Sequence, residues 1–554
     1  MPCCPVSQQN CAARHRSSVW ISRSSSYGVG SSPKSPRILV SSIIPLPPSD
    51  CPMQSTQPDD DAQMAGIPAL VLICLLLATP ALDAQIISTI DVRGNTRTRS
   101  DVIRRELLFA AGDSLDAAVI DETERNLRRL LYLGRVTIIT EPAQAGSVNV
   151  VVEVGDLYAR ALSPLFSGDI EEVSYGGVAV DFNLFGLGQT ARITAFDDAR
   201  SGRRVTTQYG DPRLGGTRLR LATEAGWAEE GHTIGLSLSQ PFYSLAAPWA
   251  FGLSASSHGS RTRLYSSGRL AALYEDRFDA ASGWLVRSYG GDVKIRPGIQ
   301  LSLSDRTFSA RSPFTYQPGN RRRVTPSLVL TVWQPRYSTA RFIRYLGPQE
   351  DFQTGSWLTL RAGLSSSALG SDRDYPFASV SVSPRFQLEG GWYLFSSFVA
   401  RSRWANGGYE SLLTSSSATL YGRLLDWPYQ PALAARLDFD TLSRPEDLGS
   451  QYLLGGNSGL RGYLPRRFDG RRRLTANVEL RPLIVHRPDW ALGAALFADA
   501  GGAWDDDPRL YSSVGAGLRL GLPRIYDTPV LRADVAHGLG AGVWQLSFGL
   551  GQYF

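Results

Sequence analysis

Short segments in which apolar side chains alternate with small or polar ones recur from Leu157 to Phe554. Examples are Ser379–Ser383 and Ala435–Phe439, and turns rich in Gly, Asp, Asn, Pro and Ser separate such segments. A period of two is typical of a β-strand with one apolar and one polar face. Since no helical stripe of useful length interrupts the series, about 400 residues predict one continuous β-structure.

The length of this β-region distinguishes two architectures. A soluble sandwich would break into several domains before reaching this length, whereas a membrane barrel can use all of it. Strands of about 10 residues, at roughly 25 residues per repeat, predict about 16 strands. We therefore expect a mainly β protein with a C-terminal transmembrane antiparallel β-barrel over residues 157–554.

The last segment of the chain favours the barrel. Along this segment, residues at odd-numbered positions are mostly small or polar, and those at even-numbered positions are mostly apolar. The apolar residues are Trp544, Leu546, Phe548, Leu550 and Phe554. A chain that ends on phenylalanine inside such a strand is expected to close a barrel. The alternative, a buried C-terminal strand of a soluble protein, would not explain the glycines on the inner face.

Residues 85–156 predict a small separate unit that precedes the barrel. Apolar residues at helical spacing, including Val119, Thr123 and Leu127, mark its second helix. The expected order is β-α-α-β-β, with strand 86–92, helices 100–110 and 116–133, and strands 136–140 and 147–154.

The N-terminal region has the features of an export signal. The longest apolar run, Ile67–Ala78, is too short to span a membrane, for which a helix needs roughly 20 residues. Cleavage after Ala84 would remove residues 64–84 as a signal peptide. We interpret residues 1–63, which are rich in Ser, Pro and basic residues, as an over-extended gene start before Met64; a disordered extension is the alternative.

Composition supports an exported β-protein and excludes several kinds of site. The chain has 54 glycines and three methionines, which favours β over helical structure. All five cysteines precede residue 85, so a mature chain would have neither disulfides nor Cys-ligated metals. The net charge of +6 is spread along the chain, which argues against nucleic-acid binding.

A glycine-rich loop and two strands carry the candidate chemistry. The loop Gly455–Tyr463 contains one arginine, Arg461. In the segment that follows it, a period of two places Glu479 on a polar face with Thr475, Asn477 and Arg481. The same period places Asp499 opposite the apolar residues of its own strand. Both acids can therefore face one polar interior.

The order of several motifs resembles the BamA/TamA outer-membrane assembly-barrel family, also called the bacterial surface antigen family. The small unit, with its Val-Arg-Gly-Asn-Thr and Leu-Tyr-Leu-Gly-Arg-Val sequences, resembles a POTRA domain; any small α+β module is the alternative. The barrel motifs are Asn183–Gly188, Asp211–Leu214, Gln240–Tyr243, Leu460–Tyr463 and Phe497–Gly501.

The resemblance implies that the Arg-Gly-aromatic motif folds back into the barrel as a latch. Applied to this sequence, the resemblance implies that Arg461 pairs with Asp499 and that Glu479 is a second possible partner. A guanidinium inside a narrow barrel needs a carboxylate. Glycines allow the sharp backbone path, so the latch motif comprises Gly459, Arg461, Gly462 and Tyr463. A solvated loop arginine is the alternative, and Arg466 serves as the surface arginine for comparison.

The resemblance also implies a function without cofactor or metal, which is to assemble, insert or translocate polypeptides at the bacterial outer membrane. The barrel would sit in the outer membrane with the POTRA domain in the periplasm. Its partners would be outer-membrane lipid, client polypeptides and periplasmic or lipoprotein subunits. The client-binding edges would be the POTRA strand with Val136 and Ile138, the barrel strand 178–182 as first strand, and the last strand with Phe548 and Phe554.

The sequence gives little support for an enzymatic function. Four widely spaced histidines follow residue 84, without a carboxylate motif of metal-site type. The sequence Gly456–Leu460 lacks the second glycine of a nucleophile elbow. Two other functions stay open: a two-partner secretion transporter, which normally carries two POTRA units and a plug helix, and a passive pore or structural surface barrel.

Overall fold

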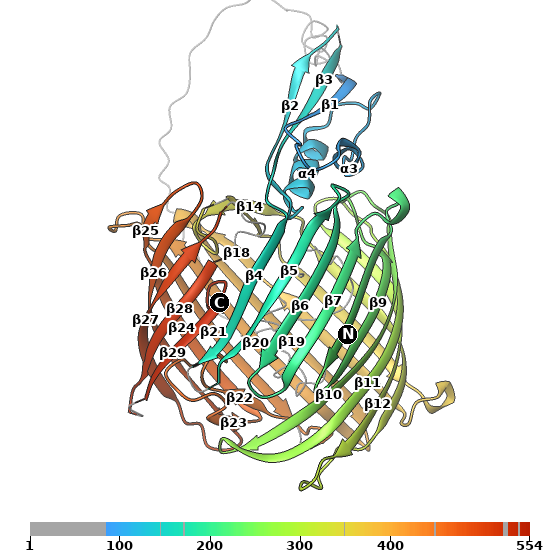
Figure 1. Ribbon diagram of the computed structural model, residues 1–554. Helices are drawn as coiled ribbons and strands as arrows, with labels where there is room; N and C mark the ends of the chain where they lie inside the picture. The colour runs from blue at the N-terminus through green and yellow to red at the C-terminus, as the bar shows by residue number, and fades with distance from the viewer. Residues whose placement is uncertain are drawn as a thin grey trace, which may run out of the picture.

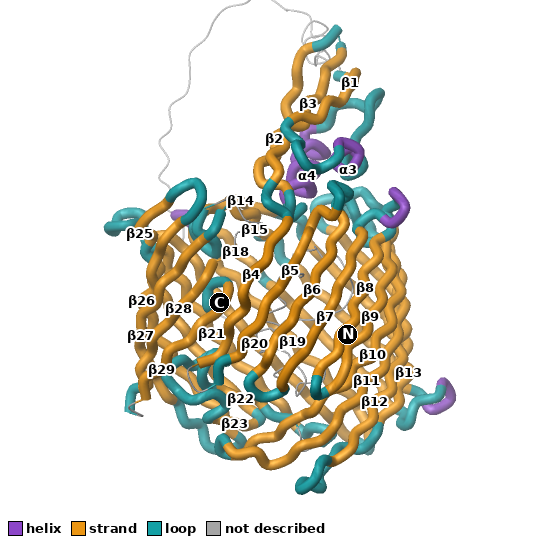
Figure 2. Tube along the Cα trace, in the orientation of Figure 1, coloured by secondary structure: helices purple, strands orange, loops and turns teal. Residues whose placement is uncertain are grey.

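The computed structural model of the protein describes residues 85–554 except 145, 170–171, 348, 448–449, 524–529 and 541–542. The predicted extension (1–63) and signal peptide (64–84) lie outside the described residues. A small N-terminal unit stands over one end of a large β-barrel (Figures 1 and 2). None of the helices in the described part of the chain is long and apolar enough to cross a membrane.

The N-terminal unit combines two helices with a three-stranded sheet of order β1-β3-β2. The central strand β3 runs parallel to β1 and antiparallel to β2. Side chains buried in its core include Val102, Leu127 and Val150. The β-α-α-β-β order is as predicted, with elements β1 (Ile86–Arg93), α3 (Ser100–Arg104), α4 (Ala117–Arg128), β2 (Leu133–Pro142) and β3 (Ser147–Asp156).

Both helices are shorter than the sequence pattern predicts. Helix α3 ends at Arg104 rather than residue 110, because Leu107 and Phe109 both enter the core. Side chains two residues apart point the same way on an extended chain and not on a helix. Helix α4 begins after Asp116, whose side chain accepts a hydrogen bond from Ala118 N at 2.8 Å, an N-cap.

The barrel strands follow one another in chain order around the wall. The first ten are β4 (Arg160–Asp169), β5 (Ser174–Leu184), β6 (Gln189–Asp198), β7 (Gly202–Asp211), β8 (Arg220–Ala228), β9 (Gly231–Gln240), β10 (Trp249–Ser266), β11 (Arg269–Arg287), β12 (Lys294–Ala310) and β13 (Arg321–Trp333).

The wall continues after a hairpin of β14 (Tyr337–Arg341) and β15 (Gln349–Gln353) at the end that carries the N-terminal unit. The remaining wall elements are β16 (Trp357–Ser365), β17 (Tyr375–Ser383), β18 (Arg385–Leu388), β19 (Trp392–Ala405), β20 (Gly408–Arg423), β21 (Ala432–Ser443), β24 (Arg472–Arg481), β25 (Leu483–His486), β26 (Ala491–Trp504), β27 (Tyr511–Gly521), β28 (Val530–Gly538) and β29 (Val543–Leu550).

The predicted number of strands was too low. Pro384 separates β17 from β18, and Pro482 separates β24 from β25. Each pair occupies one position, since both halves pair with the same neighbour, β19 or β26. Counted this way, the described residues form 20 antiparallel strands rather than about 16. The reason is that the connections between strands are shorter than we assumed in counting roughly 25 residues for each strand and its connection.

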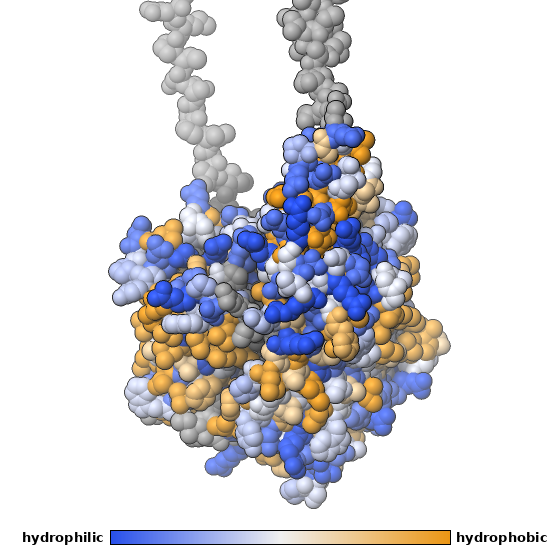
Figure 3. Space-filling view, turned by 45° about the horizontal axis from the view of Figure 1, so that its top comes forward, coloured by the Kyte–Doolittle hydropathy of each residue, from blue (hydrophilic) through white to orange (hydrophobic). Residues whose placement is uncertain are grey.

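The alternation read from the sequence corresponds to the two faces of the wall. On β26, Leu496 is exposed on the outer face while Phe497 and Asp499 are buried inside. On β29, Trp544 lies outside and Gln545 and Ser547 lie inside. On the face seen in Figure 3, apolar side chains gather in a band across the barrel, with hydrophilic residues toward both ends, as lipid on the outside requires.

The core of the N-terminal unit continues into the first barrel strands. Ala159, Val180 and Phe182 belong to the same buried cluster as Tyr132 and Leu133. The two parts therefore share apolar surface, and the unit is packed on the barrel.

Three turns of the barrel form a docking collar for the unit, at residues 183–188, 211–219 and 240–248. In the first turn, Gly186 O accepts a hydrogen bond from Arg99 N at 3.1 Å, and Leu187 O accepts one from Arg105 Nη2 at 2.8 Å. Each of the three motifs noted in the sequence lies in or next to one of these turns.

The other two turns bind the helical face of the unit. Arg213 forms an ion pair with Glu106, and each side chain is 10% exposed. In the third turn, Leu245 N donates to Glu122 on α4 at 2.7 Å. Asn126 on the same helix donates to Tyr243 O at 3.2 Å. The collar thus fixes α4 over the barrel end.

We expect Glu106→Gln to loosen the N-terminal unit from the barrel. Removing one partner of a buried ion pair costs about 3–5 kcal/mol, because Arg213 would keep an uncompensated charge. Limited proteolysis at the 156–160 connection should become faster. Glu141→Gln is the control, since the Glu141 carboxylate is exposed on β2 and forms an exposed pair with Arg93. Equal cleavage of the two variants would contradict the importance of the Arg213 contact.

Candidate functional site

The latch loop, Arg444–Arg471, connects β21 to β24 and folds back into the lumen. Two short strands, β22 (Tyr452–Leu454) and β23 (Phe468–Gly470), pair to form its stem. At its tip, Gly459 and Gly462 have φ angles of +122° and +82°, which favour glycine. A Cβ on Gly462 would lie 2.7 Å from Gly538 N, so glycine also permits close approach to β28.

Arg461 makes its main contact with Asp499 on β26. Its Nε donates to Asp499 Oδ2 at 2.7 Å and its Nη2 donates to Oδ1 at 2.8 Å. This two-point geometry is the strong form of an arginine–carboxylate pair. Asn477 Nδ2 also donates to Asp499 Oδ1, at 2.8 Å, and to Gly459 O, at 2.9 Å. The strand residue therefore fixes both the acid and the loop.

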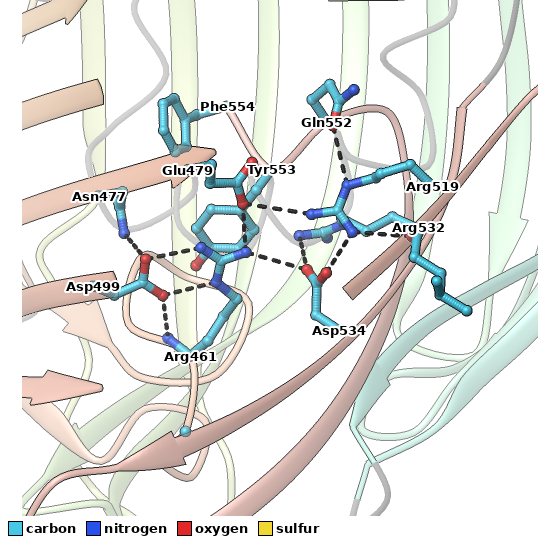
Figure 4. A network of polar contacts seen from close by, with 12 residues as sticks. Arg461, Asn477, Glu479, Asp499, Arg519, Arg532, Asp534, Gln552, Tyr553 and Phe554 are labelled. Carbon is cyan, nitrogen blue, oxygen red and sulfur yellow. Dashed lines mark hydrogen bonds and ion pairs between the residues drawn. The ribbon is translucent and has the colours of Figure 1, made fainter. Parts of the chain in front are cut away.

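Two more carboxylates reach the same guanidinium (Figure 4). Arg461 Nη1 donates to Glu479 Oε1 at 2.6 Å and to Asp534 Oδ2 at 3.2 Å. All four side chains of this cluster are 0% exposed. The structure thus brings Arg461, Asp499 and Glu479 together, and adds Asp534 of β28.

Aromatic rings cover both sides of the Arg461 guanidinium. Its Cζ lies 3.4 Å from the ring centroid of Phe497 and 3.8 Å from that of Tyr553. Stacked rings exclude water and attract the cation through their π-faces. The charge is therefore held from the edges by carboxylates and from the faces by rings.

Three further arginines complete the network, and they share the inward parity of the acids. Arg481 Nε donates to Glu479 Oε2 at 2.8 Å. Arg519 donates to Asp534, and Arg532 Nη1 does so at 3.3 Å. Glu479 and Asp534 are thus each shared between several guanidiniums, whereas Asp499 is shared between Arg461 and the neutral amide of Asn477.

The aromatic residue of the motif fixes the loop to the wall. Tyr463 is buried against Phe468 and Tyr511, with ring centroids 5.5 and 5.8 Å away. Its hydroxyl lies 2.9 Å from Ser512 O and from Leu539 O, in the segments that begin β27 and follow β28. The tip is thereby anchored to β27 and to the turn that follows β28.

The last four residues leave the wall and bind to the latch network. Strand β29 ends at Leu550, and Gly551, at φ +81°, turns the chain inward. The Tyr553 hydroxyl accepts from Gly459 N at 3.0 Å. The Phe554 oxygen accepts from Arg481 Nη2 at 3.2 Å. The expectation that Phe554 lies on the outer face of the closing strand is wrong, because the guanidiniums bind the tail inside the lumen.

The seam is the place where β29 meets β4. Among the described residues these strands pair only at Ser547 with Asp169 and Phe548 with Gly168. The predicted first strand, containing Val178–Phe182, is β5 and not the edge; it pairs on both sides, with β4 and β6. Pro164 has no backbone N–H, so it interrupts the row of hydrogen-bond donors along β4. It also makes this segment harder to recognise as a strand from its sequence.

Glu446 anchors the base of the latch loop at the end of the barrel away from the N-terminal unit. Its carboxylate lies 2.5 Å from Arg323, 3.2 Å from Arg321 and 3.0 Å from Arg403. Burial by itself would raise the pKa of Glu446, but the positive charges of these arginines outweigh burial and lower that pKa to about 2. The loop is therefore bound at its base as well as at its tip.

The predicted POTRA strand residues lie on β2, one of the two edge strands of the small sheet. Val136 is buried, and Ile138 is half-buried. Phe548 is exposed on the outer face beside the seam. Asp534, Arg519 and Tyr553 were not predicted from the sequence, although the alternation around Asp534 gives it the same inward parity as Asp499.

Within the described ranges, His, Cys, Asp and Glu side chains form no group of three or more that could hold a metal ion.

Comparisons with known proteins identify the family of the N-terminal unit and one relative of part of the chain. The family model described as "Surface antigen variable number repeat" (POTRA) matches residues 85–155. The outer membrane protein assembly factor BamA of Nitratidesulfovibrio vulgaris is 26% identical over 179 residues, which cover 30% of this chain. The matched part spans 22% of that relative's length.

Solved structures of other barrels are more distant. CdiB from Acinetobacter baumannii is 16% identical, with 85% of this chain and 74% of that chain covered and a TM-score of 0.44. BamA from Haemophilus ducreyi lacking POTRA domains 1–3 is 13% identical, with 84% of each chain covered and a TM-score of 0.39. At these scores, the likenesses decide nothing about function.

We expect Arg461→Ala to destabilise the barrel by about 3–5 kcal/mol, because three buried carboxylates would lose their shared partner. The variant should lose heat-modifiable migration on gels at a lower temperature than the parent. Arg466 is not a neutral control, since it forms an ion pair with Glu172. Arg467→Ala, an exposed site in the same loop, is the matched control. Equal melting of the Arg461 and Arg467 variants would contradict the latch.

The Glu446 anchor predicts an acid-labile loop base. The ordinary pKa of Glu446 is 4.5 and its folded pKa is about 2. Its stabilising contribution is therefore complete above about pH 4.5 and is lost as pH falls through about 2. Amide hydrogen exchange of residues 444–447 should not change between pH 7 and 5, after correction for intrinsic exchange. Glu446→Gln should already exchange faster at pH 7; unchanged protection there would contradict the anchor.

Proposed function

Because this chain is a BamA/TamA-like outer-membrane barrel with a POTRA domain before it, we propose that it assembles, inserts or translocates other polypeptides at the outer membrane. In this proposal, a client pairs with the seam between β4 and β29. The POTRA domain faces the periplasm and receives clients or partner subunits.

The short seam is the observation that carries the proposal. Strands β28 and β29 pair continuously from Leu531 with Leu550 to Gly538 with Val543. In contrast, among the described residues β4 has no partner on its seam side from Arg160 to Ser167. Unpaired backbone donors and acceptors on an exposed edge are a template for another strand. The seam therefore supports strand exchange with a client.

The lumen is a less favourable route than the seam. A cavity of about 600 Å³ lies beneath α4, and its lining includes Arg125 of the helix, Arg129 directly after it and Gln300 of the wall. The latch loop lies farther along the lumen, held by Arg461 and its buried acids. A chain passing through would have to break that network, whereas opening the seam separates few backbone pairs.

In this proposal no residue of the latch performs chemistry. Arg461, Glu479 and Asp499 are bonded to one another and buried, so they hold the barrel in one conformation. We accordingly propose a non-enzymatic protein that works without cofactor, with client polypeptides and outer-membrane lipid as its partners.

Site-specific photocrosslinking at the seam tests the proposal. Benzoylphenylalanine at Phe548 should capture newly made outer-membrane proteins in cells, because that side chain borders the unpaired part of β4. The matched control is Leu328 on β13, which is exposed to lipid about half-way round the wall. It should give lipid adducts and far fewer protein adducts.

Two outcomes would favour the other functions. Equal capture of proteins from Phe548 and Leu328, or capture of lipid alone, would contradict assembly at the seam. Capture of a secreted protein from lumen residues such as Gln300 would indicate a two-partner secretion transporter. Large ion conductance without any client would indicate a passive pore.

A further inference from the structure

Strand β2 is one of the two edges of the POTRA sheet, and its register shows which backbone groups face outward. Ile138 is opposite Val152 of β3, yet its N–H donates to a side chain instead of to β3. In an antiparallel pair, outward-facing groups recur at every second residue. Val136, Ile138 and Thr140 therefore present their N–H and C=O groups to the edge.

The central one of these donors is occupied by Glu124 of α4. Glu124 Oε1 accepts from Ile138 N at 2.6 Å. Its other oxygen accepts from Arg128 Nη1, one helical turn away, at 3.0 Å. A hydrogen bond to an ionised acceptor is roughly twice as strong as a neutral one. Glu124 is thus held by two contacts in the position that a pairing strand would need.

Arg128 connects this cap to the barrel. Its Nε lies 3.3 Å from Asp351 Oδ2 on β15, in the hairpin beneath the unit. The side chains of Glu124, Arg128 and Asp351 are 21–23% exposed, so water does not replace them freely. The cap is part of the docked arrangement of the two domains.

We propose that Glu124 gates the β2 edge and that an extended client strand binds there by displacing the carboxylate from Ile138. With Glu124 in place, the N–H of Ile138 is occupied. This residue lies between Val136 and Thr140, so an added strand cannot form backbone hydrogen bonds to three outward-facing residues in a row. With Glu124 displaced, three outward positions in a row become available. This inference rests on the proposed function, because the strand received is a client's.

The spacing of the backbone donors and acceptors along β2 indicates what kind of molecule would bind there. Donors and acceptors repeat at every second residue along β2, which matches another extended backbone. A single polar side chain would meet one of them at a time. The strand β29 is a suitable probe, because its own seam edge is mostly unpaired among the described residues and its sequence alternates as client strands should.

Photocrosslinking in the purified full chain tests the gate. Benzoylphenylalanine replaces Ile139, whose side chain is exposed beside the edge. The probe is a fluorescein-labelled synthetic peptide with the sequence Val543–Phe554. Glu124→Ala should raise the yield of crosslinked peptide about tenfold, the factor expected when a competing charge-assisted hydrogen bond is removed. Arg128→Ala should raise it by less, because Glu124 keeps its bond to Ile138.

The control is Asp121→Ala, which removes the same charge from an exposed site on the same helix and should leave the yield unchanged. Hydrogen exchange at Ile138 should become faster in Glu124→Ala without peptide, while Val150 and Val152 stay protected if the sheet is folded. No increase in yield with Glu124→Ala, or an equal increase with Asp121→Ala, would overturn the proposal.

This experiment separates the gate from the proposed function. Failure of the gate would be seen in purified protein as equal peptide capture by the parent and Glu124→Ala. Failure of the assembly function would be seen in cells as the absence of client capture at Phe548. Either result can occur without the other.

Discussion

The structure depends on neutralising one guanidinium inside a closed barrel. Taking a charged group out of water costs several kcal/mol unless partners replace its hydration. For Arg461, carboxylates on β24, β26 and β28 supply those partners, and the rings of Phe497 and Tyr553 cover its faces. A single side chain thus ties the loop tip, three wall strands and the end of the chain into one arrangement.

That arrangement has a consequence for the seam. The pairing of Phe548 with Gly168, if continued, would place Leu550 opposite Phe166 and the last residues opposite Pro164 and Leu162. These last residues instead turn at Gly551 and bind Arg461, Arg481 and Arg519. The latch and the seam therefore use the same residues, and stability of the latch keeps the seam short.

The second constraint is the docking collar. The three turn motifs that supported the family resemblance bind the N-terminal unit. Gly186 and Leu187 bind the segment around α3 through their carbonyls, Arg213 pairs with Glu106, and Tyr243 and Leu245 bind α4. Their physical role is to hold the POTRA domain at a fixed place, where Glu124 and Arg128 reach both the β2 edge and the barrel.

The sequence alone determined which residues of a strand share a face, because this depends on a local period of two. Alternation every two residues separated Leu496 from Asp499 and placed Glu479 and Asp499 on one inner face. It also gave the barrel class, because neighbouring residues of a strand must face lipid and lumen in turn. Helical spacing and turn residues likewise defined the POTRA order.

Tertiary structure alone decided what depends on contacts between distant segments. The number of strands could be counted only once the lengths of the connections were known. The edge strand β4 could be identified only once the structure showed which strand meets β29. The inward turn of the tail depends on Arg461 and Arg481, which lie 92 and 73 residues before the tail residues that they contact, so Phe554 had no local signal of its position. Asp534 and Glu124 were likewise ordinary acids until folding placed them beside Arg461 and the Ile138 amide, since a period gives the face of a residue and not its partner.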